Sequence, residues 1–133
     1  MPSSSTTNPG IIEPHLLSGR RIVNISYFMS QIQVMNNHGH FECSFSSMKI
    51  MSEVRKGLTS GIRMKCEMCQ FQEMVWTEDP DNEQRPVNTA AVSGVMKIGG
   101  GFANLEQLLS TFDIPPLSSK TYQKEHNIIA TAW

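Results

Sequence analysis

The stretch MKIMSEVRKGLTSGIRMKCEMCQFQEMVW, residues 48–76, decides the fold of this chain. It contains three segments of strand-forming character, with breaks at Lys56-Gly57, at Ser60-Gly61 and at the CxxC pair Cys66–Cys69. Glycine in such a break marks a tight turn, and a CxxC turn brings two sulfur atoms together. The order strand, turn, strand, knuckle and strand predicts a small antiparallel sheet built around a metal knuckle.

The cysteines and two histidines gather in this part of the chain. All three cysteines fall within 27 positions, and His38 and His40 lie just upstream of Cys43. Thiolate and neutral imidazole are the ligands that Zn²⁺ prefers, and a site with four of them leaves no coordination position open for water. We therefore predict one structural zinc ion in a zinc-ribbon-like module. Its ligands are Cys43, Cys66, Cys69 and His38, with His40 as the alternative to His38.

Length and charge limit the classes of function. The chain has 133 residues and a formal net charge of −1, which excludes a basic nucleic-acid-binding protein in the usual sense. The distribution of charge is uneven: residues 20–76 hold seven Lys/Arg against four acids, and residues 77–133 hold four against seven. A polyanion is therefore expected to contact the metal-binding half, or the local pair Lys120 and Lys124.

The cysteine count and the first residues predict the compartment. Three cysteines cannot all pair, and the opening MPSSSTTNPG is too polar for a signal segment. No apolar run approaches the 18 or so residues of a membrane span. We expect a nuclear or cytoplasmic protein that is not secreted and has neither a membrane nor a small-molecule substrate as partner.

Composition divides the chain into four parts. Residues 1–19 are polar and predict a disordered arm, and residues 20–76 form the metal-binding module. Residues 77–86 (TEDPDNEQRP) predict an acidic surface linker, and residues 87–133 a helical unit. We expect an α+β fold in which a three-strand module is followed by a small three-helix, helix-turn-helix-like unit.

Helical periodicity and capping residues place the helices. A short β-prone stretch at 20–25 precedes a helix capped by Ser26, in which Phe28, Ile32 and Met35 recur at helical spacing. After the linker, three helices are expected. The first is capped by Asn88 or Thr89 and ends at Gly99–Gly101, the second covers 103–112, and the third is capped by Ser118 or Ser119.

Basic and polar side chains suggest where nucleic acid would bind. The start of the last helix combines phosphate-contacting residue types with free backbone N–H groups. The sheet module adds a second group of cations. The predicted nucleic-acid contacts are Arg55, Lys56, Arg63, Lys65, Lys120, Tyr122, Gln123 and Lys124.

The chain resembles the N-terminal part of the Mutator-like transposase domain of transposon-derived arthropod proteins. Three segments carry the resemblance, which covers residues 19–133: GRRIVNISYF (19–28), GLTSGIRMKCEMC (57–69) and NTAAVSGVMKIGGGFANLEQLLSTFDIPPLSSKTYQKEH (88–126). In that family such a region precedes a nuclease core of the RNase H type. The resemblance therefore implies a DNA-handling fragment. His38 matches the family pattern better than His40, although the position of that histidine varies.

The expected catalytic strand of the family, of the type V-D-G-x-W, does not occur before Trp133. We therefore expect a zinc-stabilised DNA-binding fragment that binds DNA weakly and is not an enzyme. The alternative is a non-catalytic protein-interaction module that offers an apolar stripe to a protein partner. That stripe contains Leu105, Leu108, Leu109 and Phe112. A third option is an enzyme completed by acidic residues from another chain.

Overall fold

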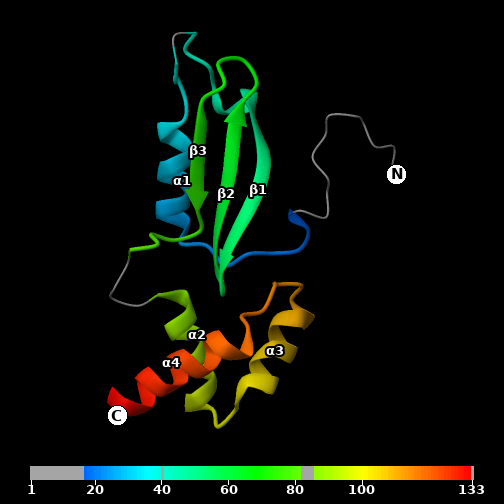
Figure 1. Cartoon of the computed structure of the whole chain (residues 1–133), viewed down its shortest axis with the longest axis vertical. Helices are drawn as coiled ribbons and strands as arrows, with labels where there is room; N and C mark the ends of the chain where they lie inside the picture. The colour runs from blue at the N-terminus through cyan, green and yellow to red at the C-terminus, as the bar shows by residue number, and fades with distance from the viewer. Residues whose placement is uncertain (1–16, 40, 82–85, 133) are drawn as a thin grey trace, which may run out of the picture.

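The computed structural model describes residues 17–39, 41–81 and 86–132 of the chain. A helix and a three-stranded antiparallel sheet form one part, and three helices form the other, with one end of the sheet facing those helices (Figure 1). The predicted α+β class, with a three-strand module before a helical unit, is confirmed. Residues 1–16 of the predicted arm lie outside the described residues.

The sheet has the order β1-β2-β3, and both strand pairs are antiparallel. Its strands are β1 (Met48–Lys56), β2 (Thr59–Cys66) and β3 (Gln72–Trp76). The two-residue loop Gly57-Leu58 joins β1 to β2, and Gly57 has a φ of 66°, which favours glycine. The predicted turn at Lys56-Gly57 is therefore confirmed.

The second predicted break, at Ser60-Gly61, is wrong because both residues lie inside β2. Gly61 pairs with Trp76 of β3, and a Cβ atom on Gly61 would lie 2.7 Å from the Trp76 ring. The glycine makes room for the indole and not for a turn, since a strand glycine often marks a close approach.

Helix α1 (Ile25–Val34) packs on one face of the sheet, and its predicted apolar periodicity is confirmed. Phe28 and Ile32 pack against the buried residues of this core. The Gln31 side chain bonds the backbone N–H and C=O of Trp76, at 2.8 and 2.7 Å, and so covers the free edge of β3. The buried core residues are Met35, Cys43, Met48, Met64, Cys66 and Val75.

The predicted N-cap of α1, Ser26, is wrong. The side chain of Asn24 accepts a hydrogen bond from the Tyr27 N–H at 3.1 Å, so Asn24 caps the helix and Ser26 lies inside it. Asparagine is among the strongest N-cap residues, so the helix starts at the earlier polar residue.

The β-prone stretch at 20–25 is not a strand. Its backbone bonds two separate loops: the Arg20 N–H donates to the Asp113 carbonyl and the Asn24 N–H to the Thr77 carbonyl, both at 2.8 Å. The Arg21 guanidinium binds both carboxylate oxygens of Glu53 on β1, at 2.7 and 3.0 Å. These side-chain and loop contacts hold the stretch without strand pairing, and they connect both parts of the molecule.

The helical unit contains α2 (Val87–Lys97), α3 (Phe102–Thr111) and α4 (Ser119–Ala132). Ser118 caps α4 as predicted, because its Oγ accepts from the Thr121 N–H at 3.1 Å. The predicted caps of α2 are wrong: Pro86 precedes the first turn, and the side chains of Asn88 and Thr89 bond other elements. The buried core contains Leu58, Val92, Val95, Leu105, Leu109, Leu117, Tyr122 and Ile129.

The tip of the β1–β2 hairpin is inserted into this helical unit. Leu58 is only 4% exposed and belongs to the core of the helices, although it lies between two strands. The side chain of Asn88 on α2 accepts from the Leu58 N–H at 2.7 Å and donates to the Lys56 carbonyl at 2.9 Å. The two parts therefore share buried surface and directed hydrogen bonds.

The first two residues of the stretch at 77–86 are packed. Thr77 is buried and exchanges hydrogen bonds with the backbone of Ser60. The Glu78 carboxylate accepts from the Thr59 hydroxyl at 3.1 Å and from the Val87 N–H at 3.0 Å. The exposed part of the stretch begins at Asp79, and residues 82–85 lie outside the described residues.

Candidate metal centre and nucleic-acid interface

The two loops at the end of the sheet opposite the helical unit carry the predicted ligands (Figure 1). Cys66 is the last residue of β2, and Cys69 lies in the turn to β3. His38 and Cys43 lie after α1 and are joined by two backbone hydrogen bonds of 3.1 and 2.9 Å. Two short hairpin-like turns thus present one pair of candidate ligands each.

The structure brings four of these side chains together. One ligand atom from each of His38, Cys43, Cys66 and Cys69 lies within 4.8 Å of the other three. Within residues 17–39, 41–81 and 86–132 this is the one such cluster of three or more His, Cys, Asp or Glu side chains. His40, the predicted alternative, lies outside the described residues. The cluster could hold a metal ion.

The imidazole of His38 is oriented for such a role. Its Nδ1 bonds the Met35 carbonyl, and its ring stacks on Phe71 with the centroids 4.6 Å apart. Its Nε2 is buried and has no hydrogen-bond partner among the described residues. Buried polar atoms in proteins almost always have a partner, and metal-bound histidines commonly use their second nitrogen to bond a backbone carbonyl. A metal ion at Nε2 would satisfy this atom.

Two supporting positions were missed from the sequence. Gly39 has a φ of 75°, and a Cβ atom there would lie 3.0 Å from Sγ of Cys69. The Met68 N–H points at Sγ of Cys66 at 3.4 Å. A glycine directly after a candidate ligand was the signal that could have identified Gly39, because only glycine combines this φ with a close sulfur atom.

The thiols of the cluster have divergent pKa values. Burial, together with the neighbouring thiols of Cys66 and Cys69, raises the pKa of Cys43 to about 11. Burial also acts to raise the pKa of Cys66, but a hydrogen bond from the Cys69 backbone, the nearby His38 imidazole and a hydrogen bond from the Met68 backbone bring it down to about 6. Sulfur atoms this close cannot all ionise unaided, whereas a bound cation deprotonates its thiol ligands.

The basic residues predicted on the sheet divide between its two faces. Side chains alternate along a strand, so Arg63 and Lys65 share the face that α1 does not cover. Lys49 of β1 pairs with Lys65 and belongs to the same face, although it is not among the contacts predicted from the sequence. The strand register was the missing information. Arg55 pairs with Ser60 and lies on the α1 face.

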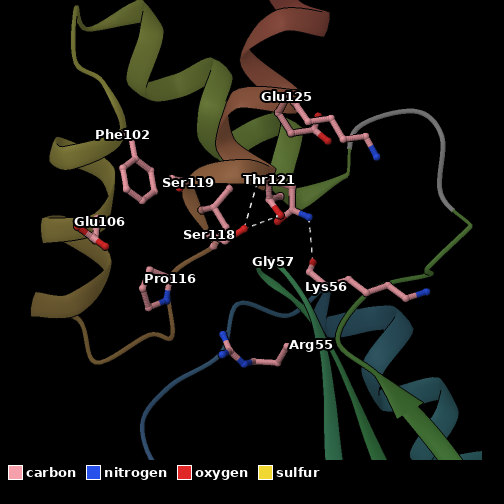
Figure 2. Close-up of a pocket in the computed structure, with 13 residues that line it drawn as sticks. Arg55, Lys56, Gly57, Phe102, Glu106, Pro116, Ser118, Ser119, Thr121 and Glu125 are labelled. Carbon is pink, nitrogen blue, oxygen red and sulfur yellow. Dashed lines mark hydrogen bonds between the residues drawn. The ribbon is translucent and has the colours of Figure 1, made fainter.

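The hairpin tip borders a cleft of about 790 Å³ between the sheet and the helices (Figure 2). Arg55 and Lys56 reach its edge from the sheet, and Lys124 lines it from α4. Two carboxylates, Glu106 and Glu125, line the same cleft, so its charge is mixed.

The start of α4 differs from the prediction at one position. Lys120, Gln123 and Lys124 are exposed and therefore accessible to nucleic acid. Tyr122 is 6% exposed and packs in the helical core against Phe102, with the ring centroids 5.5 Å apart. Its ring is therefore not available to nucleic acid, because the helix turns position 122 inward, and we remove Tyr122 from the expected contacts.

The predicted apolar stripe of α3 is only half exposed. Leu105 and Leu109 are buried in the helical core, whereas Leu108 and Phe112 are 52% and 51% exposed. These two line an apolar groove of about 390 Å³ that also contains Ile22 and Ile98.

A comparison with protein families shows which family the chain belongs to. The family model described as Mutator-like transposase matches residues 19–133. The chain belongs to the Mutator-like transposase family. The matched region contains the sheet, all four α-helices and the four clustered candidate ligands of this Mutator-like transposase chain. No curated protein and no solved structure matches it. Among the described residues, no helix has both the length and the apolar character needed to cross a membrane.

Proposed function

We propose that this chain is a zinc-stabilised DNA-binding module of a transposase-derived protein, without nuclease activity of its own. The observation that carries the proposal is the cluster of His38 and three cysteines within a Mutator-like transposase domain. The cluster is the argument for a structural metal ion, and membership of a transposase family is the argument for DNA as the partner.

Zinc is the proposed metal because of the donor set. Three thiolates and one imidazole form a common four-coordinate structural zinc site, and soft sulfur ligands disfavour magnesium and calcium. A site saturated by protein ligands has no position for a substrate or an activated water. The proposed role of the ion is therefore to stabilise the loops around the sheet, which buries few large side chains of its own.

DNA binding is proposed from the family and from charge. The module at 20–76 has an excess of three positive charges on a chain that is otherwise acidic. Its cations lie on the open sheet face and at the hairpin tip, and those of α4 lie across the cleft. A nuclear or cytoplasmic location follows from this proposal.

Binding to duplex DNA is expected to weaken steeply with salt. Three to six phosphate contacts predict a slope of log affinity against log salt of about −3 to −5, because each contact releases condensed counterions. Fluorescence anisotropy of a labelled duplex between low and moderate salt measures this slope. A zinc-loaded, folded sample that shows no salt-dependent binding at low ionic strength would refute DNA binding.

We also expect that the chain alone neither cuts nor joins DNA. Two-metal phosphoryl chemistry requires carboxylates that converge on a pair of ions, and the described residues contain no such group. Incubation of supercoiled plasmid with the protein and Mg²⁺ or Mn²⁺ should leave the plasmid intact. Cleavage that co-purifies with the protein and disappears when one of its acidic residues is replaced would show the expectation to be wrong.

A second candidate function is protein interaction, and the apolar groove of the helical unit favours it. The exposed side chains of Leu108 and Phe112 would contact a protein partner there. If the unmodified chain shows no salt-dependent DNA binding, this function is favoured. The double variant Leu108→Ser/Phe112→Ser would then test it.

A further inference from the structure

The face of the sheet that α1 leaves open is unusual in its charge. The strand register places eleven residues on it, and none of them is an aspartate or glutamate. Lys49, Arg63 and Lys65 lie in its half nearer the metal cluster. The residues of this open face are Lys49, Ser52, Val54, Lys56, Thr59, Gly61, Arg63, Lys65, Gln72, Met74 and Trp76.

Two of these cations directly oppose each other. Lys49 on β1 and Lys65 on β2 are Cα partners in the antiparallel ladder. Directly opposed side chains of one sheet face lie about 5 Å apart at Cβ, and like charges in such pairs destabilise the sheet. Within the part of the chain that the structure describes, neither lysine forms an ion pair with a carboxylate. The pairing therefore has a cost in the free protein that a bound anion would offset.

Arg63 extends this charge along β2. It lies two residues from Lys65 on the same face, which is a separation of about 7 Å along a strand. Its side chain is exposed, and it too has no carboxylate partner among the described residues. Three cations on adjacent strands thus form a row with a spacing fixed by the sheet.

We infer that the phosphate backbone of duplex DNA lies on this open face, across Lys49, Arg63 and Lys65. The inference rests on the proposed DNA-binding function and specifies its surface. Charge complementarity favours this face over the cleft, since Glu106 and Glu125 line the cleft beside its three cations.

The aromatic content of the face points to duplex rather than single-stranded DNA. Trp76 is the one aromatic side chain on it, and the Lys56 ammonium lies over its ring, 5.3 Å from the centroid. Single-strand binding surfaces stack successive bases on several exposed aromatic rings, which this face does not offer. The cations of the face instead favour contacts to the phosphates of a duplex.

The test compares two matched double variants, Lys49→Gln/Lys65→Gln on the sheet and Lys120→Gln/Lys124→Gln on α4, with Lys97→Gln as the control. Each phosphate contact contributes about eightfold to affinity at about 0.1 M salt. The sheet variant should therefore bind a labelled duplex about 60-fold more weakly, with a salt slope smaller by about 1.8. The α4 variant should lose less, and Lys97→Gln should bind as the unmodified chain does.

The melting temperature of the Lys65→Gln variant gives a second readout, because a lysine with a merely structural role would not lose DNA affinity while the protein becomes more stable. Lys65→Gln removes the like-charge pair, so its melting temperature should rise at low salt while its DNA affinity falls. A loss of affinity in the α4 variant that equals or exceeds that of the sheet variant would overturn the inference and leave DNA binding in place. Tighter binding of a single strand than of the duplex would also overturn it. An unmodified chain without salt-dependent binding would instead refute the proposed function.

Discussion

Cys66→Ser is expected to release the metal and unfold the region of residues 38–76. Cys66 is fully buried, and its sulfur belongs to both the ligand cluster and the core of the sheet. Binding of a structural zinc ion contributes on the order of 10 kcal/mol to folding, which is comparable to the whole stability of a small domain. Circular dichroism and metal analysis of the purified variant measure the two losses together.

The matched control is Met68→Ser, in the same turn. Met68 is exposed, and its contribution to the cluster is its backbone N–H, which serine retains. This variant should keep both its metal and its fold. A Cys66→Ser protein with native circular dichroism and an unchanged metal content would refute the assignment of Cys66 as a ligand.

Leu58→Ala is expected to destabilise the protein by about 2–5 kcal/mol, as Leu→Ala changes in packed cores do. Leu58 is the one side chain of the hairpin that is buried among the helices, and its loss would leave a cavity between α2 and α4 residues such as Val92 and Ile129. The metal cluster lies at the other end of the sheet, so metal content should be retained. Chemical denaturation followed by circular dichroism measures the change in free energy of unfolding.

Leu108→Ala provides the comparison for this prediction. It removes the same atoms from the helical unit, but at a half-exposed position, and should cost much less stability. Equal effects of the two substitutions would show that the hairpin tip is not part of the helical core.

The grouping of candidate metal ligands could be predicted because its chemistry is local in sequence. A CxxC pair, a third cysteine and a nearby histidine identify themselves by residue type and spacing, and the structure brings His38, Cys43, Cys66 and Cys69 within 4.8 Å. The role of Gly39 could not be predicted, because it depends on where the Cys69 sulfur lies in space.

Strands and helices were predictable as types, but several of their ends were not. Asn88 is a good N-cap residue by type, yet its amide bonds the hairpin of residues 56–58, thirty residues away in sequence. Gly61 looks like a turn residue and instead faces Trp76 across the sheet. In both cases a tertiary contact replaced the local preference.

The basic residues of the sheet could also be predicted by type but not by their position in space. Residue type was enough to propose Arg63 and Lys65 as nucleic-acid contacts. Only the strand register shows that Lys49 lies on the same face as these two residues and that Arg55 lies on the opposite face. Tyr122 was misplaced for a similar reason, since the packing of α4 turns its ring into the core.

The metal content of the chain, purified without added metal and without chelator, shows whether the cluster of His38 and three cysteines holds a structural zinc ion. Elemental analysis by mass spectrometry should find one zinc ion per chain, and removal of that ion by a chelator should abolish the native circular dichroism of the sheet module. A chain that contains no stoichiometric metal, and whose circular dichroism is unchanged by the chelator, would show that zinc does not stabilise this fold.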